Sequence, residues 1–302
     1  MIKNVFITGG LGQDGKILTK LLNKKKINLN IITKSNKAIK NKKITFIQSS
    51  LLNKKRLKSI FAKNKPDILL HLGANNPSYN EDSYKLFFKD NLLATKNIFY
   101  STFKANKKAK FIFCSSSQIF KKKNGTVNEK SKVMATSDYT KFRIDSHNMM
   151  LKYKKKNKIQ YTNAILFNHD SKFRNKKFII PRISKAIIGK KTNFLNKIIK
   201  ANISSDYSHA ADICNGLNKL MFSKLNLDKI ILSSNKITSL SDIILYVIKK
   251  NNLKINVKYR KIKVEGLKGN NKLAKNKLKW SPKLNIFKAA DEIYKFYKKT
   301  KI

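Results

Sequence analysis

The feature that most constrains the fold is a glycine-rich turn close to the start of the chain. The sequence VFITGGLGQDGKILTKLL joins an apolar run to an amphipathic segment, and Gly9, Gly12 and Gly15 have the spacing G-x-x-G-x-x-G. Glycines at this spacing permit a tight turn, a close backbone approach to a pyrophosphate, and close packing of a helix on a sheet. The N–H groups that begin the helix then face the anion. We therefore expect a strand, a dinucleotide-binding turn and a helix here.

The first half of the chain alternates short β-branched runs with amphipathic segments of helical length. The expected strands are Lys3–Thr8, Leu29–Thr33, Ile44–Ile47, Ile68–Leu72, Lys110–Cys114 and Gln160–Leu166. The expected helices are Asp14–Lys25, Lys54–Lys63, Ser83–Lys104 and Asp138–Lys156. This alternation is typical of the α/β class and predicts a Rossmann-type, doubly wound parallel sheet.

After Leu166 the alternation becomes irregular. Helices are expected at Ile179–Gly189, His209–Phe222, Ser239–Asn251 and Asn285–Lys298, with lysine-rich loops between them. We interpret this part as a smaller α/β C-terminal substrate lobe over the carboxyl ends of the strands, where open α/β sheets bind ligands. The predicted domains are therefore residues 1–166, which bind the cofactor, and residues 167–302, which bind the substrate.

The net charge of +52 raises the question of nucleic-acid binding. Only five of the 68 basic residues are arginine, and the lysines are scattered over the whole chain. Specific recognition of bases and phosphates relies on arginine forks and clustered basic stripes. We predict no specific nucleic-acid partner, although a polyanion would bind such a surface weakly and with strong salt dependence.

Several classes of protein are disfavoured by what the sequence lacks. No apolar run approaches the roughly 20 residues that span a bilayer, so no membrane association is predicted. The N-terminus lacks the apolar region of a signal peptide, and two cysteines cannot form a disulfide framework, so a reducing cytoplasm is expected. No metal is predicted, because the four histidines show no metal-ligand spacing: His71, His147, His169 and His209.

The choice of cofactor depends on the end of the second strand. An Asp or Glu there would bind the ribose 2′-hydroxyl of NAD. The sequence IITKSNK has no carboxylate at this point and places Lys34 there instead. A cationic pocket suits a 2′-phosphate, so NADP is predicted in preference to NAD.

The sequence CSSSQIF at Cys114–Phe120 ends the fifth strand with three hydroxyls and a glutamine. Tyr139 follows at the start of a helix, and Arg143 lies four residues further on. Residues at i and i+4 share one helix face, and a cation there lowers the pKa of a phenol that exchanges a proton with substrate. This pattern resembles the Ser/Thr and Tyr-x-x-x-Lys of short-chain dehydrogenases, with arginine in place of lysine.

Motifs along nearly the whole chain resemble one family of extended short-chain dehydrogenases/reductases, the GDP-mannose 4,6-dehydratases. ITGGLGQDG resembles T-G-x-x-G-Q-D-G, HLGANN resembles L-G-A-Q-S, and DYSHAADI resembles D-W-G-H-A-x-D-Y. AILFNHDS at Ala164–Ser171 is very similar to I-L-F-N-H-E-S. From Arg260 to KLKWSP the chain resembles a segment that begins R-P-x-E-V-D and closes with L-G-W-x-P.

The resemblance implies hydride transfer at C4 of a GDP-sugar, either GDP-mannose or a 4-keto derivative, and a homodimer or homotetramer. Tyr139 would accept the hydroxyl proton, and Ser116 would hydrogen-bond the same oxygen. The implied cofactor contacts are Gly9, Gly12, Gln13, Asp14, Gly15, Lys34, Ser50, Leu51, Leu72, Gly73, Ala74, Tyr139 and Arg143. The implied substrate contacts are Asn168, Lys177, Arg182 and Arg260.

The sequence also departs from the family pattern at catalytic positions. Gln118 stands where the dehydratases have the Glu that removes a proton for water elimination, and a carboxamide cannot act as that base. Arg143 replaces the lysine, Ser50 replaces an Asp that contacts adenine, and Ser205 replaces an Arg. The first hypothesis is an NADP-dependent enzyme that resembles GDP-mannose 4,6-dehydratase, with water elimination if the base function survives. The alternative is a 4-keto sugar-nucleotide reductase or epimerase such as GDP-4-keto-6-deoxymannose reductase, and the third hypothesis is a nucleotide-binding protein with weakened catalysis.

Overall fold

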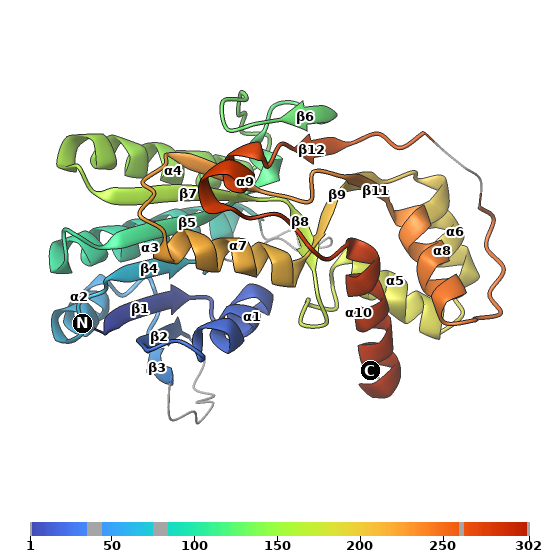
Figure 1. The fold of residues 1–302 in the computed structure, drawn as a ribbon, viewed down its shortest axis with the longest axis horizontal. Helices are drawn as coiled ribbons and strands as arrows, with labels where there is room; N and C mark the ends of the chain where they lie inside the picture. Colours follow the sequence, from blue (N-terminus) through green and yellow to red (C-terminus); the bar gives the residue numbers. More distant parts are fainter. Residues whose placement is uncertain (1, 35–43, 75–83, 260–262, 301–302) are drawn as a thin grey trace. The chain divides into compact units, whose positions relative to one another are not determined.

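The computed structural model describes residues 2–34, 44–74, 84–259 and 263–300. Its main sheet has seven strands in the order β10-β7-β5-β4-β1-β2-β3, which lie side by side in Figure 1. The strands are β1 (Lys3–Thr8), β2 (Ile27–Thr33), β3 (Ile44–Gln48), β4 (Ile68–His71), β5 (Lys110–Ser116), β7 (Gln160–Leu166) and β10 (Lys229–Leu232). The predicted doubly wound, Rossmann-type parallel sheet is confirmed.

The winding direction changes at β1, which pairs in parallel with β2 on one side and with β4 on the other. The chain continues to β3 beyond β2, and later to β5 beyond β4. In open α/β sheets, the crevice at the carboxyl ends of the strands where the order reverses is the ligand-binding position. The glycine-rich turn follows β1 and therefore lies at this point.

Helices α2 (Lys54–Lys63), α3 (Tyr84–Ala105) and α4 (Asp138–Asn157) share one aromatic core with the sheet. At its centre, the Phe99 ring meets the rings of Phe111 and Tyr161 edge-on. Edge-to-face pairs of this kind add about 0.5–1.5 kcal/mol each to the free energy gained from burial. This packing sets α4, which carries Tyr139, against α3 and the end of β5.

Two parts of the main sheet differ from the sequence-based expectation. Strand β10 was not predicted, because a run of four residues between loops has too few positions to show a periodicity. Strand β5 continues to Ser116, beyond the expected end at Cys114. The other predicted strands and helices of this sheet are present, with ends that differ by a few residues, including α1 (Gln13–Leu22). The start predicted at Ser83 lies outside the described residues.

The chain forms two compact units that interleave along the sequence. One unit comprises residues 1–121, 132–165 and 214–230, and the other comprises residues 122–131, 166–213 and 231–302. Most of α7 (Ala210–Phe222) thus belongs to the unit that contains the glycine-rich turn. The prediction of two domains that divide at residue 166 stays a prediction.

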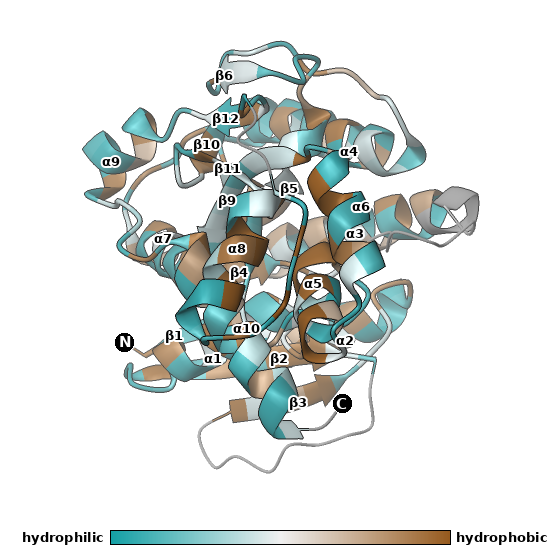
Figure 2. Cartoon of the chain, turned by 90° about the vertical axis from the view of Figure 1, so that its right-hand side faces the viewer, coloured by the Kyte–Doolittle hydropathy of each residue, from teal (hydrophilic) through white to brown (hydrophobic). Residues whose placement is uncertain are grey.

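The second unit contains short strands and the remaining helices. A three-stranded sheet has the order β11-β9-β8, and β12 pairs with β6. The elements are β6 (Gly125–Val127), β8 (Asn168–Asp170), α5 (Ile179–Ile188), α6 (Thr192–Lys200), β9 (Ser204–His209), β11 (Ile237–Ser239), α8 (Leu240–Lys250), β12 (Leu267–Gly269), α9 (Lys272–Leu278) and α10 (Ile286–Thr300). Helices α5, α6, α8 and α10 bury apolar stripes in one core, and Figure 2 shows α8 with both hydrophobic and hydrophilic residues. No described helix is long and apolar enough to cross a membrane.

Candidate functional site

The carboxyl ends of five neighbouring strands bring the predicted cofactor residues to one edge of the sheet. Strands β5, β4, β1, β2 and β3 are adjacent and parallel, so their ends share this edge. The predicted residues along it are Gly9, Gly12, Gln13, Asp14 and Gly15 after β1, Lys34 after β2, Ser50 and Leu51 after β3, Leu72, Gly73 and Ala74 after β4, and Ser116 and Gln118 at the end of β5.

The glycine-rich turn has the local geometry that its sequence predicts. Gly9 has φ +72°, which favours glycine, and a Cβ there would lie 2.9 Å from the Gly73 nitrogen. A Cβ on Gly15 would lie 2.3 Å from the Gly10 Cα, so the first turn of α1 packs directly on the backbone. Sequence reasoning missed Gly10 itself, whose Cβ would lie 2.5 Å from Ile31 Cγ2 of β2. Side chains are excluded at all three positions by close contacts.

The front of this turn fits a phosphate group. Gly12 is the N-cap of α1 and no side chain caps the helix. Gly9 and Gly12 are exposed, and the Gly9 carbonyl is the one heavy atom near a Cβ built on Gly12, at 3.3 Å. The N-terminus of α1, with its positive helix dipole, therefore stands open toward solvent, which is the arrangement that binds a pyrophosphate.

The ends of β2 and β3 place a lysine and a serine beside each other. The Ser49 nitrogen donates to the Thr33 carbonyl at 2.9 Å, which joins the two strand ends. Asn97 of α3 donates to the Leu51 carbonyl at 3.3 Å and so holds the loop after β3. Lys34 is exposed here, and the described residues of this edge place no carboxylate beside it. The preference for NADP over NAD stays a prediction.

The end of β5 turns into a short 3₁₀ helix, η1 (Ser117–Ile119). The Ser116 hydroxyl accepts the Gln118 N–H at 3.3 Å and caps this turn. Ser116 is partly exposed, and the Gln118 side chain is exposed. The hydroxyl and the carboxamide predicted for the catalytic edge thus stand on one rigid turn, and this turn carries no acid.

The start of α4 presents Tyr139 and Arg143 toward the end of β5. A capping box between Ser137 and Thr140 fixes the first turn of the helix, and Tyr139 lies within it, partly buried. The Arg143 guanidinium lies 5.1 Å from the centre of the Tyr139 ring, and Nη1 donates to the Cys114 carbonyl of β5. Arg143 is 5% exposed, so its charge is held in place by the fold. The structure therefore brings the predicted phenol, the cation and the end of β5 together.

Buried cysteines and a histidine lie behind this edge. Burial raises the pKa of the Cys114 and Cys214 thiols, so neither is a nucleophile near neutral pH. Burial, with a smaller contribution from the Arg143 charge, lowers the pKa of His71 to about 3. Within the described ranges, no group of three or more His, Cys, Asp or Glu side chains could hold a metal ion.

Three of the predicted substrate residues are described and belong to the second unit: Asn168 in β8, Lys177 in the loop before α5, and Arg182 in α5. Asn168 donates from Nδ2 to the Ser205 hydroxyl of β9 at 2.9 Å. Lys177 is exposed, and the partly buried Arg182 places its guanidinium 5.3 Å from the centre of the Phe194 ring. Arg260 lies outside the described residues. Among the described residues of this set, the structure thus gives Asn168 a hydrogen-bond partner and places Arg182 beside an aromatic ring.

Sequence reasoning missed Asp206, a fully buried carboxylate of β9. It accepts hydrogen bonds from the Ser234 N–H and hydroxyl at 2.9 and 2.6 Å, from the Asn235 N–H at 3.0 Å and from the Gly269 N–H at 3.1 Å. Burial raises the pKa of Asp206 to about 6 against the opposing effect of these hydrogen bonds. Its donors are distant in sequence, so no local signal could have found this role. The carboxylate joins β9 to β12 and to the loop before β11.

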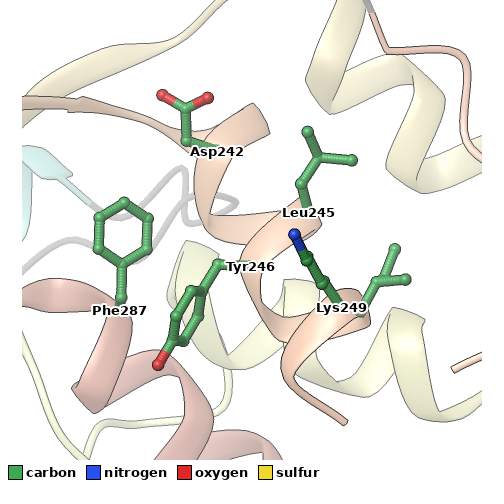
Figure 3. A pocket seen from close by; sticks show the side chains of 6 residues that line it. Asp242, Leu245, Tyr246, Lys249 and Phe287 are labelled. Carbon is green, nitrogen blue, oxygen red and sulfur yellow. The ribbon is translucent and has the colours of Figure 1, made fainter. Parts of the chain in front are cut away.

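A separate hollow of about 470 Å³ lies in the second unit between α8 and α10. Figure 3 shows the side chains that line it, among them Asp242, Leu245, Tyr246, Lys249 and Phe287. The Tyr246 and Phe287 rings lie 5.0 Å apart. None of the predicted site residues lies in this hollow, so it is no part of the candidate site.

The fold and the site together define a nucleotide-binding protein of the short-chain dehydrogenase/reductase class. The defining features are the glycine-rich turn after the first parallel strand, the serine at the end of the fifth strand, and the tyrosine on the next helix. The sequence model for GDP-mannose 4,6 dehydratase matches residues 6–293. The chain therefore belongs to this family of sugar-nucleotide dehydratases and epimerases.

Individual relatives agree with this assignment. A dTDP-D-glucose 4,6-dehydratase from Dictyostelium discoideum is 26% identical over 52% of this chain, and the match spans 42% of that relative. UDP-glucose 4-epimerase with UDP-glucose from Thermotoga maritima has a TM-score of 0.84 at 17% identity, covering 99% of this chain and 100% of the other. dTDP-glucose 4,6-dehydratase from Bacillus anthracis in complex with NAD has a TM-score of 0.82 at 15% identity, covering 98% and 97%. RMD from Pseudomonas aeruginosa complexed with NADPH has a TM-score of 0.77 at 16% identity, covering 99% of each chain. At these identities the structures establish the shared fold.

Proposed function

We propose that the protein transfers a hydride and a proton at C4 of a GDP-linked hexose and does not itself eliminate water. This activity is that of a 4-keto sugar-nucleotide reductase or epimerase. Gln118 is the observation that carries the proposal: it lies on the turn after β5, and its place in the sequence resembles that of the dehydratase base. Hydride transfer at C4 needs no base at that position, whereas water elimination does.

The glycine-rich turn, Lys34 and the loops after β3 and β4 would hold a nicotinamide dinucleotide. When bound, this cofactor would accept a hydride from the substrate or return one to it. NADP is the proposed cofactor in preference to NAD, because Lys34 is an exposed cation at the end of β2. A 2′-phosphate would gain a charge-assisted contact with it, while a ribose hydroxyl would lack the acidic partner that NAD enzymes provide.

Tyr139 and Ser116 would handle the proton at the substrate O4. Tyr139 would accept the proton when C4 is oxidised and donate it when the ketone is reduced. Ser116 is partly exposed on the adjoining turn and would hydrogen-bond the same oxygen. Arg143 places its guanidinium 5.1 Å from the centre of the Tyr139 ring, so a fixed positive charge lies beside the proposed proton-transfer group.

The GDP part of the substrate is proposed from the second unit. Asn168 and Arg182 occupy positions that resemble the nucleotide contacts of the family, and Lys177 and Arg260 are the further proposed contacts. Arginine pairs well with a diphosphate through charge-assisted hydrogen bonds. A homodimer or homotetramer and a cytoplasmic location stay predictions.

A second candidate function is GDP-mannose 4,6-dehydration. It is favoured by the family match over residues 6–293 and by the F-N-H-D-S segment that contains Asn168. This activity would require a carboxylate or another base to replace the missing Glu. The Gln118 carboxamide offers no proton affinity in the neutral range.

Two incubations decide between these functions. The purified chain is mixed with NADPH and a GDP-4-keto-6-deoxyhexose, and separately with NADP and GDP-mannose. We expect NADPH to be consumed in the first mixture and no 4-keto-6-deoxy product to form in the second. Dehydration of GDP-mannose by the unaltered chain would refute the main proposal in favour of the second candidate.

The variant Gln118→Glu serves as a matched test of the missing base. It should form the 4-keto-6-deoxy product from GDP-mannose, because it restores a carboxylate on the turn that carries Ser116. Tight nucleotide binding without turnover of either substrate would instead support a nucleotide-binding protein with weakened catalysis. If neither form bound a guanine nucleotide, the proposed substrate would be wrong.

A further inference from the structure

A buried chain of hydrogen bonds runs behind the glycine-rich turn from helix α3 to the loop after β4. Thr95 Oγ1 of α3 lies 3.0 Å from His71 Nε2, and His71 Nδ1 lies 2.7 Å from Thr8 Oγ1 at the end of β1. Thr8 Oγ1 in turn accepts the Gly73 N–H at 3.0 Å. The three side chains are at most 1% exposed. We name these four residues the Thr95–Gly73 relay.

The donors and acceptors of the relay assign its protons. The Gly73 N–H can only donate, so Thr8 Oγ1 accepts there, and its own hydrogen needs a further acceptor. His71 Nδ1 is that acceptor, which leaves the imidazole proton on Nε2, pointing at Thr95 Oγ1. Burial keeps the ring neutral by lowering the pKa of His71 to about 3. The rings of Phe111 and Phe113 pack against it at 6.2 and 5.9 Å between centres.

The relay acts at a point where the ends of β1 and β4 approach each other closely. A Cβ on Gly9 would lie 2.9 Å from the Gly73 nitrogen, and a Cβ on Gly73 would lie 2.9 Å from Thr8 Oγ1. The Gly73 backbone is therefore wedged between the Thr8 side chain and the first glycine of the turn. A shift of Gly73 would move Gly9 and, through the Gly12 N–H bond to the Gly9 carbonyl at 3.0 Å, the N-terminus of α1.

We propose that His71 is a positioning residue for the nicotinamide dinucleotide. Through Thr8 it holds Gly73 against Gly9, so that the N–H groups of the turn stand where the pyrophosphate binds. This inference rests on the proposed cofactor site. His71 touches no substrate or cofactor atom in this role, since it is buried behind the turn.

Substitutions at the two inner residues of the relay test the proposal. His71→Leu removes both ring nitrogens, Thr8→Val removes the hydroxyl at nearly constant shape, and Thr8→Ser restores it. Dissociation constants for NADPH and NADH are measured by calorimetry, together with melting temperatures. We expect His71→Leu and Thr8→Val to weaken dinucleotide binding about 10-fold or more, and Thr8→Ser to bind within about 2-fold of the unaltered chain.

Thr102→Val is the matched control, because Thr102 is also buried in α3 and its hydroxyl bonds only within the helix, to the Ile98 carbonyl at 2.7 Å. It should lower the melting temperature without changing the dinucleotide affinity. If His71→Leu and Thr8→Val lowered the melting temperature like this control and left the affinity unchanged, the relay would be merely structural and the proposal would be overturned. Should His71→Leu fail to fold, Thr95→Val breaks the same relay at its far end. Weaker dinucleotide binding by Thr95→Val would then support the proposal, and a lowered melting temperature with unchanged affinity would overturn it.

Hydrogen exchange in the ligand-free protein separates this proposal from the proposed function. Exchange at the Gly73 amide should be faster in Thr8→Val than in the unaltered chain, and not in Thr102→Val. An unaltered chain that bound no nicotinamide dinucleotide would refute the proposed function and the positioning role together. Normal dinucleotide binding with unchanged Gly73 exchange in Thr8→Val would refute the relay alone.

Discussion

The glycine-rich turn after β1 and the catalytic edge formed by β5 and α4 share one sheet, but the two regions keep their family pattern to different degrees. At the turn, Gly9, Gly12 and Gly15 match the motif, and close contacts exclude side chains at Gly9 and Gly15. At the catalytic edge, Gln118 and Arg143 both depart from it. Backbone geometry enforces the glycines, whereas an exposed side chain such as Gln118 can change without loss of the fold. The turn therefore indicates the class of cofactor, and in the proposed function the residues of the catalytic edge determine the reaction.

The largest effect is expected at the turn. In Gly15→Ala, the new Cβ would lie 2.3 Å from the Gly10 Cα, so the backbone must move. We expect a loss of about 3 kcal/mol in the free energy of unfolding, together with loss of dinucleotide binding. Denaturant titration and calorimetry would measure both. Gly189→Ala is the control, since its Cβ would meet nothing closer than 3.4 Å, and it should change stability by less than about 0.5 kcal/mol.

At the catalytic edge, substitution should affect activity and leave the fold intact. Tyr139→Phe removes the proposed proton-transfer group, so turnover should fall about 10²- to 10⁴-fold, with the melting temperature nearly unchanged. Steady-state rates on the 4-keto substrate would measure this loss. Tyr153→Phe makes the same change on the same helix and should keep full turnover. Equal activity in Tyr139→Phe and the unaltered chain would remove the tyrosine from the mechanism.

Acid should weaken the protein through histidines buried in the first unit. Burial lowers the pKa of His71 from 6.5 to about 3 and that of His147 from 6.5 to about 4. Below pH 6.5 these histidines bind protons in the unfolded chain but stay neutral in the folded chain. The free energy of unfolding therefore decreases as the pH falls from 6.5 toward the pKa values of the folded chain. Each histidine should account for a loss of about 2 kcal/mol between about pH 7 and about pH 5.

A comparison of variants at the two histidines separates the effect of the relay on dinucleotide binding from the effect of a buried histidine on stability. Denaturant midpoints at both pH values should show a shallower pH dependence in His71→Leu and in His147→Leu than in the unaltered chain. Of these two variants, only His71→Leu should also weaken dinucleotide binding, because His147 bonds to Tyr161 at 2.8 Å and not to the relay. An unchanged pH dependence in both variants would show that these rings do not resist protonation.

The smallest effect is expected on the solvent face of α4, two residues from Arg143. Lys141 and Asp145 form an i,i+4 ion pair of 2.6 Å with 53% and 36% of their side chains exposed. Such pairs contribute little because water and salt screen them. Asp145→Ala should change the free energy of unfolding by less than about 0.5 kcal/mol and leave turnover unchanged, which denaturation and rate measurements can check. A loss above 1–2 kcal/mol would show that this face of α4 is more than a solvated surface.

Much of the fold, including the glycine-rich turn after β1, could be predicted from the sequence, because its signals are local. Strand β1 and helix α2 have the predicted bounds, since hydrophobic periodicity over one segment determines them. The turn was predicted because its three glycines lie within seven residues. Strand β10 was missed because its four residues become a strand only by pairing at the edge of the sheet.

By itself, the sequence determined the strand–turn–helix unit, the doubly wound sheet and the residue types at the catalytic edge. The tertiary structure alone decided what those residues touch. Arg143 donates a hydrogen bond to the Cys114 carbonyl, which lies 29 residues from it in the sequence. The hydrogen-bond donors of Asp206 lie 28 to 63 residues from it in the sequence. His71 and Thr8, 63 residues apart, become partners because β1 and β4 are neighbours in the sheet. Backbone preference acts between adjacent residues and can be recognised in the chain, whereas a buried polar group takes whichever partner the completed fold places beside it.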